Sequence, residues 1–389
     1  MDNFQEALRL LGGLVAFDTT SRNSNLDLIR FAEAHLAAHG IGCALRHDAS
    51  GQKAVLHAVI GPQVDGGVAL SAHVDCVPVD GQAWRADPFT LRREAGRLIG
   101  RGTCDMKGFA ACMLAMAPIF AKAGLQRPVH LCLSFDEETS FAGAPILLQQ
   151  MAAAPKPAAC IVGEPSLLTP IIAHKGYHSW DVRVTGVSGH SSRATETANA
   201  LQAAAEGIAW IAAKAREFAA HGRRVEGFDP AYTTVHAGFL HAGSVLNIVP
   251  DEAIFAFEVR SVPGDEAAPV KDALVRQFDE VIMPPLRAVS ADCNAYFSVR
   301  AAAPPLGLPE RHALVGFTQA LSGRNGFGRV AYGTEAGFFE GDGIASIVCG
   351  PGDIAQAHQP EEWIAESEIA ACLVMMERLA ESLAHGHGP

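Results

Sequence analysis

Five short segments of the chain each bring acidic or histidine side chains to the point where an apolar run ends or a helix begins. The segments are "LSAHVD", "GRGTCDMKG", "LSFDEETS", "CIVGEP" and "GPGDIAQAH". They supply His73, Asp75, Asp105, Asp136, Glu137, Glu138, Glu164 and His358. Two imidazoles with several carboxylates, and no cysteine among them, suit zinc, cobalt or manganese. The segments predict a metal site if the fold brings them together.

The elements that precede these side chains favour one shared location. Short apolar runs such as "GVALSAHVD", "VHLCLSFDEE", "AACIVGEP" and "IASIVCGPG" alternate with helical patterns, including 108–123 and 143–153. We therefore expect an α/β domain with a mostly parallel sheet flanked by helices. Ligands of open parallel sheets bind at the carboxyl ends of the strands, so the five segments would meet at one rim. "GRVAYGTEAG" is also expected to be a strand, and Asn25 to cap a helix beginning at residue 26.

The pattern changes between residues 177 and 300. "YHSWDVRVTG" alternates polar and apolar residues, a helical stretch follows, and the remaining runs complete a β-α-β-β-α-β order, which is typical of a ferredoxin-like unit. The chain has 389 residues, and single cores usually stop growing at roughly 250–300 residues. We expect a catalytic domain formed by 1–176 and 301–389, interrupted by an α+β domain at 177–300.

Composition excludes several classes of protein. The net charge is −12, without the basic surface of a nucleic-acid-binding protein. Nine cysteines are scattered without a CxxC pair, which favours free thiols in a reducing compartment. The start "MDNFQEALRL" lacks the basic region of a secretion signal, and the apolar run at 109–121 is too short to span a bilayer. A cytoplasmic protein without nucleic-acid or membrane partners is expected.

Each candidate residue also has an ordinary structural explanation. A single histidine such as His57 or His130 more often packs in the core, and Asp105 alone could cap the following helix. "GVSGH" is not the nucleophile motif of serine hydrolases, because His190 stands where that motif needs glycine. No cysteine has a recognisable histidine context. The joint pattern of five segments, rather than any one residue, favours a metal centre.

The segments "SAHVDCVPVDGQAW", "GRGTCDMKGFAA", "SFDEETSFAGA", "VGEPS" and "GPGDIAQAHQP" resemble, in this order, the five metal-site motifs of the co-catalytic dinuclear zinc amidohydrolases. That family includes acetylornithine deacetylase, succinyl-diaminopimelate desuccinylase, aminoacylase and carboxypeptidase G. The resemblance extends to the inserted domain through "VTGVSGHSSR" and "GSVLNIVPDEAIFAFEVR". It implies that this domain is a lid that forms a homodimer. "AFDTTSRNSN", "HKGYHSW" and "GTEAGFF" most resemble the acetylornithine deacetylases.

The resemblance implies two metal ions, zinc foremost, with cobalt or manganese as alternatives. His73 and Glu164 would hold one ion, Glu138 and His358 the other, and Asp105 would bridge them. It also implies a cis peptide bond after Asp105.

The remaining roles concern catalysis and substrate. Asp75 would orient His73, Glu137 would be the general base toward an activated water, and His190 would bind the oxyanion, in cis or from a partner subunit. The resemblance suggests that Asn247 and Arg260 hold a substrate carboxylate, and Glu335 is a candidate partner for a substrate ammonium.

The expected substrate is a small N-acylated amino acid. The first expectation is removal of acetyl from N2-acetyl-L-ornithine, giving ornithine and acetate for arginine biosynthesis. Desuccinylase, aminoacylase or dipeptidase activity on the same scaffold is the alternative. A non-catalytic homologue is disfavoured, because a binding module has no reason to keep a base beside a complete ligand set.

Overall fold

The computed structural model describes residues 2–389, apart from the side chain of Ala194. The chain forms two compact units. The first comprises the residues up to Ala173 together with Leu306–Arg329 and Thr334–Pro389, and the second comprises His174–Pro305 and Val330–Gly333. The expected limits of 177 and 300 lie just inside those of the second unit.

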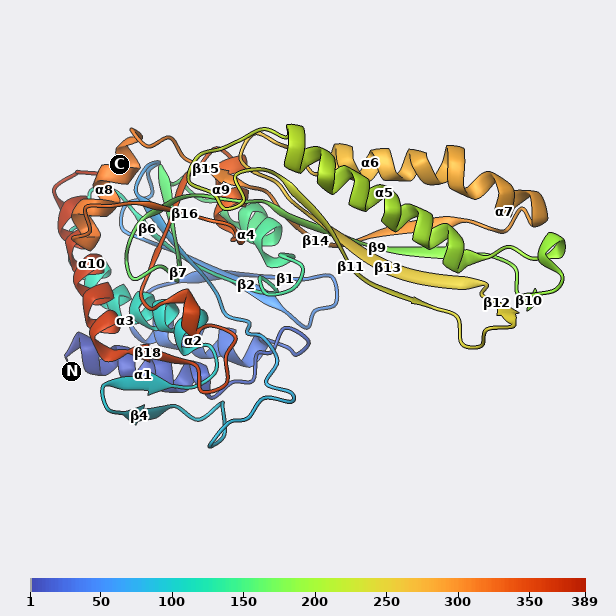
Figure 1. The fold of residues 1–389 in the computed structure, drawn as a ribbon. Coiled ribbons are helices and arrows are strands. Elements are labelled where there is room, and N and C mark those ends of the chain that lie inside the picture. The colour runs from blue at the N-terminus through green and yellow to red at the C-terminus, as the bar shows by residue number, and fades with distance from the viewer. Residues whose placement is uncertain (1) are drawn as a thin grey trace. The chain divides into compact units, whose positions relative to one another are not determined.

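A nine-stranded sheet is the framework of the first unit (Figure 1). Its spatial order is β1 (Cys43–His47), β2 (Ala54–Ile60), β6 (Val129–Ser134), β3 (Val68–His73), β7 (Ala159–Pro165), β17 (Ala345–Gly350), β8 (Ile171–His174) and β15 (Leu306–Gly307), with β16 (Gly328–Val330) paired to β8. The central strands β6, β3, β7 and β17 are parallel, whereas β1, β2 and β8 pair in antiparallel fashion. The predicted α/β class is confirmed, with antiparallel strands at the sides of a parallel centre.

Helices cover both faces of this sheet. They are α1 (Asn3–Val15), α2 (Leu26–Ala38), α3 (Gly108–Lys122), α4 (Gly143–Met151), α8 (Ala313–Ser322), α9 (Ala336–Gly341) and α10 (Glu366–Ala384). A small sheet of β4 (Arg92–Glu94), β5 (Arg97–Ile99) and β18 (Trp363–Ala365) completes the unit. The apolar segment Thr103–Lys122 has the length and composition of a membrane span, but 83% of its most apolar window is buried inside the protein. It packs here as the core helix α3.

Strand register decides which side chains share a face of the central sheet. Ser71 and His73 of β3 lie beside Cys132 and Ser134 of β6, and Ser71 also pairs with Val162 of β7. Because side chains alternate along a strand, all of these residues and Glu164 project to the same face. That face ends at the carboxyl rim of the parallel strands, where the candidate residues were expected to meet.

The second unit is a four-stranded antiparallel sheet in the order β11 (Thr234–Ala242), β13 (Glu252–Arg260), β9 (Tyr177–Thr185) and β14 (Ala295–Ala303). Helices α5 (Ala200–His221), α6 (Ala268–Gln277) and α7 (Met283–Val289) lie along one face of it (Figure 1). The chain order β9-α5-β11-β13-α6-β14 has the ferredoxin-like topology. Trp180, Phe255 and Phe278 form part of its buried core. A short pair, β10 (Gly189–His190) and β12 (Ile248–Val249), forms a separate sheet.

Candidate active site

Three ligand-type side chains from three segments meet at the end of β3. His73 Nε2 lies 3.0 Å from Asp105 Oδ1 and 3.6 Å from Glu164 Oε1. All three are at least 95% buried. His73 is the last residue of β3, Glu164 lies near the end of β7, and Asp105 lies, with a non-helical backbone, in the turn Thr103–Lys107 that leads into α3. The peptide bond from Asp105 to Met106 is cis, as expected.

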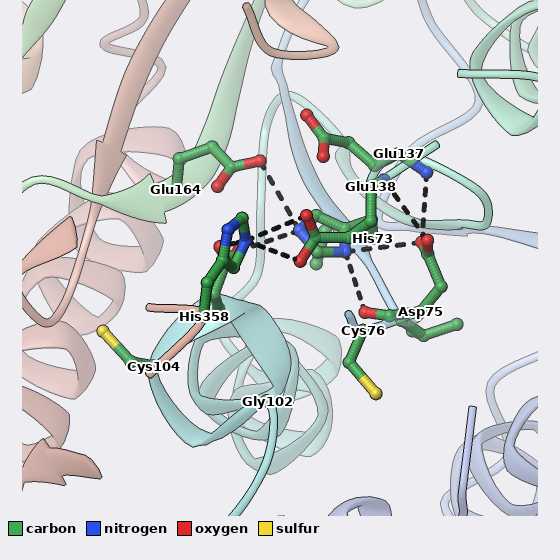
Figure 2. Close-up of polar contacts among 12 residues, drawn as sticks. His73, Asp75, Cys76, Gly102, Cys104, Glu137, Glu138, Glu164 and His358 are labelled. Carbon is green, nitrogen blue, oxygen red and sulfur yellow. Dashed lines mark hydrogen bonds and ion pairs between the residues drawn. The ribbon is translucent and has the colours of Figure 1, made fainter. Parts of the chain in front are cut away.

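A second group shares Asp105 with the first. His358 Nε2 lies 3.3 Å from Asp105 Oδ2 and 2.9 Å from Glu138 Oε2. The two oxygens of the Asp105 carboxylate therefore face two different histidines, which is the position that a bridging ligand would occupy. Figure 2 shows His73, Glu138, Glu164 and His358 converging on this point.

The neighbouring glutamates Glu137 and Glu138 reach the site because the strand has already ended. β6 stops at Ser134, and Asp136 adopts a left-handed conformation with φ of 59°. The chain thus leaves the sheet, and strand alternation no longer separates the two side chains. Among the residues that the structure describes, Glu138 pairs with His358, whereas the Glu137 carboxylate has no hydrogen bond or ion pair (Figure 2).

Asp75 fixes this turn in a way that the sequence did not indicate. Its carboxylate accepts hydrogen bonds from the backbone N–H groups of Glu137 (3.1 Å) and Glu138 (3.3 Å), and from the hydroxyl of Ser21 (2.7 Å). The expected contact with His73 is made chiefly by the backbone: Nδ1 lies 3.1 Å from the Asp75 carbonyl oxygen and 3.4 Å from the carboxylate. Asp75 therefore orients His73 and also holds the glutamate pair.

Two overlapping sets of side chains have the geometry to hold a metal ion. The atoms of His73, Glu137 and Glu164 lie within 4.8 Å of one another, and so do those of His73, Asp105 and Glu138. Imidazole and carboxylate ligands without thiolate fit zinc and other first-row divalent ions. Glu137 lies close enough to His73 and Glu164 to act on a group that these two residues hold. Geometry alone leaves Glu137 open as either a base or a ligand.

The charges of the site also favour cations. Burial, together with the neighbouring Asp105, raises the pKa of Glu164 well above its usual range, and burial with the neighbouring Glu164 does the same for the pKa of Glu137. Burial and Asp105 raise the pKa of Glu138 to about 7. Glu164 Oε1 is buried and has no hydrogen-bond partner in the part of the chain that the structure describes. Buried carboxylates of this density need compensating positive charge, and two divalent ions would supply it.

The two histidines respond in the opposite direction. Hydrogen bonds to Asp105 and Glu138 raise the pKa of His358 to about 10. Burial opposes protonation of His73, yet its contacts with Asp105 and Asp75 raise its pKa well above the usual value. Imidazolium at these positions stands in for the positive charge that a bound metal would provide.

Of the remaining candidate residues, three belong to the second unit and one to the first. His190 and Asn247 lie side by side in the second unit, where the backbone N–H of Ser191 donates to the Asn247 carbonyl at 3.0 Å. Arg260 ends β13, 2.8 Å from Glu258 and 4.6 Å above the ring of Tyr177. Glu335 belongs to the first unit and precedes α9, although a strand was expected there.

Glu335 is a buried acid without a cationic partner among the described residues. It is 1% exposed, and neither of its carboxylate oxygens has a hydrogen bond of normal geometry. Burial raises its pKa to about 7, although the nearby hydroxyls of Ser134 and Ser71 oppose this shift. Its place beside Ser71 and Ser134 puts it on the same face of the sheet as His73.

The fold and this cluster define a metal-dependent hydrolase with a parallel-sheet catalytic unit. Residues 69–382 match the model of peptidase family M20/M25/M40, and the chain belongs to that family. The family resemblance seen in the motifs is thereby confirmed.

Individual relatives agree with this assignment. Acetylornithine deacetylase of Myxococcus xanthus is 34% identical over 99% of this chain and 99% of its own. An M20 family metallo-carboxypeptidase from Sulfolobus solfataricus superposes with a TM-score of 0.73 at 17% identity, covering 99% of this chain and 100% of its own. A Bacillus subtilis structure described as a dinuclear metal-binding peptidase of the M20 family has a TM-score of 0.66 at 15% identity, with 98% and 99% covered. The two structures share the fold of this chain.

Proposed function

We propose that this protein hydrolyses N2-acetyl-L-ornithine to L-ornithine and acetate, in the cytoplasm and as a step of arginine biosynthesis. Two observations support the substrate. The relative named acetylornithine deacetylase matches almost the whole chain. The observation that carries the proposal is the buried carboxylate of Glu335, which lies on the site face of the sheet and has no cationic partner among the described residues.

The residues of the cluster have distinct tasks in amide hydrolysis. His73 and Glu164 would hold one zinc ion, Glu138 and His358 the other, and Asp105 would lie between them. When bound, the ions would activate a water molecule and polarise the amide carbonyl. Glu137, whose carboxylate has no competing partner among the described residues, would take a proton from the attacking water and pass it to the leaving nitrogen.

Glu335 supplies the preference for a cationic side chain. A carboxylate that is buried without a partner loses its hydration and gains none of the energy of an ion pair. The δ-ammonium of acetylornithine would provide the missing charge, whereas a neutral side chain of the same length would not. A substrate with a neutral side chain would leave the buried carboxylate unpaired and would therefore bind less favourably. Such a difference in binding free energy is an effective source of specificity.

The second unit supports a homodimer. Asn247 precedes β12, and Arg260 ends β13, so the nine-residue strand Glu252–Arg260 separates them. Eight steps of about 3.4 Å give a separation of roughly 27 Å, too far for both residues of one chain to hold a single small carboxylate. If both act on one substrate, they come from two subunits. Leu246, next to Asn247, is 100% exposed, and contact with a partner subunit would bury this apolar side chain.

A substrate panel tests the proposal. Metal-free protein is reconstituted with zinc or cobalt, and kcat/KM is measured for acetylornithine, acetyl-norleucine, a succinylated diamine and a dipeptide. The proposal expects two metal ions per chain and acetylornithine as the best substrate. A succinylated substrate or a dipeptide hydrolysed faster would assign the chain to another activity of the same scaffold. A protein with both ions bound and no amide hydrolysis would remove the enzyme assignment.

A further inference from the structure

A buried ion pair contacts the backbone of the turn that carries Asp105. Arg101 Nη1 donates to Glu362 Oε2 at 2.8 Å, and the two residues are 0% and 1% exposed. Glu362 follows the His358 segment in the chain, whereas Arg101 lies in the segment that carries Asp105. The pair thus connects two segments that are more than 250 residues apart in sequence.

The carboxylate of Glu362 organises the turn that carries Asp105. One of its oxygens accepts from the backbone N–H groups of Cys104 (2.9 Å) and Asp105 (3.1 Å), and the other accepts from Gly102 (3.0 Å). These N–H groups lie in a buried turn, and no described strand accepts a hydrogen bond from them. One side chain therefore fixes the backbone of the turn at the residue that would bridge both ions.

The guanidinium of Arg101 extends the contact to the His358 segment. Arg101 donates to the side-chain oxygen of Gln82 and, at 3.4 Å, to the carbonyl of Gln359. Gln82 in turn donates to the carbonyl oxygen of His358 at 3.0 Å. His358 has a left-handed backbone, with φ of 63°, so its carbonyl and its ring depend on external support for their orientation.

Stability alone is a poor explanation for this arrangement. Buried ion pairs lose much of their attraction to desolvation, and apolar replacements are often neutral or stabilising. Groups that hold metal ligands in place, by contrast, commonly change metal affinity or activity about 10- to 100-fold when altered.

We propose that Arg101, Glu362 and Gln82 form a positioning network that sets the affinity of the metal position shared by Asp105, Glu138 and His358. This inference rests on the metal centre of the proposed function. It adds that the orientation of Asp105 and His358 depends on hydrogen bonds to their backbone groups. The residues that make these hydrogen bonds would contact neither the metal ions nor the substrate.

The test compares three variants with the wild-type protein. Glu362→Gln keeps the shape but replaces one acceptor oxygen with a donor that faces backbone N–H groups. Gln82→Ala removes the hydrogen bond to the His358 carbonyl from a half-buried position, together with the two that the Gln82 side-chain oxygen accepts from Arg101 and Trp84. Glu361→Gln is the matched control, because Glu361 is the neighbouring glutamate and, within the described part of the chain, pairs only with Arg85 and Arg92 near the surface.

Zinc is titrated calorimetrically into each metal-free protein, and the absorption spectrum of the cobalt form is recorded. Glu362→Gln should weaken one of the two binding events about 10- to 100-fold. Gln82→Ala should weaken the same event about two- to tenfold, the range expected for loss of the hydrogen bond to the His358 carbonyl. Both should alter the cobalt spectrum and lower kcat more than they change KM, while Glu361→Gln matches wild type.

The outcomes separate this inference from the proposed function. If both variants bind two zinc ions with wild-type affinity and differ only in melting temperature, the network is merely structural and the inference is wrong. If Glu362→Gln does not fold, the zinc affinity of Gln82→Ala alone decides whether the inference holds. If the wild-type protein itself binds no metal, the proposed function fails instead.

Discussion

The division of labour between Glu137 and Glu138 is open to a sharp test. Glu137→Gln leaves the backbone N–H that donates to Asp75 in place, so the turn should keep its shape. Among the described residues the Glu137 carboxylate has no partner to lose. A general base contributes about 100- to 10,000-fold, so kcat should fall by that factor, which corresponds to roughly 2.7–5.4 kcal/mol of activation free energy.

Metal content should stay near that of the wild-type protein. Burial and the nearby Glu164 raise the pKa of Glu137, so its charge is unfavourable in the metal-free site. Replacing it with a neutral amide removes a repulsion, and the metal-free variant should melt no lower than wild type. Metal content is measured after dialysis, beside acetate release. Glu138→Gln serves as the contrast, because Glu138 faces His358 and its loss should release metal. If Glu137→Gln loses metal to the same degree, Glu137 is a ligand and another group is the base.

Three further predictions follow from other parts of the structure. His57 Nε2 and His130 Nδ1 share a buried hydrogen bond of 3.0 Å, and burial lowers the pKa of each to about 4. In the unfolded chain each histidine has the ordinary pKa of about 6.5 and binds a proton below that pH, whereas the folded protein binds it only near pH 4. The free energy of unfolding should therefore fall between pH 6.5 and 4, by about 3 kcal/mol for each imidazole. Urea unfolding of wild type and of a His57→Gln/His130→Gln variant checks this, and equal pH slopes would contradict it. For Glu335, whose pKa burial raises to about 7, protonation competes with ammonium binding. KM for acetylornithine should therefore rise as pH falls below 7, whereas KM for acetyl-norleucine stays level, and Glu335→Gln should abolish the difference; an unchanged preference would exclude the role. Finally, if His190 acts on the partner subunit, mixing inactive His190→Ala with inactive Glu137→Gln should restore about a quarter of wild-type activity through random pairing. No recovery despite exchanged subunits would place His190 in cis.

The sequence was sufficient for the class of fold and for the composition of the cluster, because both depend on local rules. Apolar runs separated by helical patterns indicate a parallel sheet, and polar residues after those runs collect at its carboxyl rim. His73 and Glu164 illustrate this, since each lies at or near the end of its own strand and both project to the same face. The antiparallel pairing of β1 and β2 was not predicted, because an apolar run does not indicate the direction of a strand relative to its neighbours.

Other features depend on contacts between distant segments and have no local signature. Asn25 was expected to cap a helix, yet its side chain exchanges two hydrogen bonds of 2.9 Å with the backbone of Ala54 at the start of β2. Glu362 stands next to Glu361 in the chain, and nothing in "QPEEW" distinguishes the buried residue from the exposed one. Glu335 was expected in a strand but precedes α9, since "GRVAYGTEAG" ends its pairing at Val330.

Asp75 shows how the two halves of the cluster depend on each other. Its carbonyl oxygen contacts His73, and its carboxylate holds the N–H groups of Glu137 and Glu138. Asp75 therefore orients the imidazole of His73, the ligand candidate Glu138 and the proposed base Glu137. A pattern of histidine and aspartate two residues apart predicts only the first of these tasks. The other two arise because β3 and β6 are adjacent parallel strands that end at the same level, so that a carboxylate following one can cap the turn following the other.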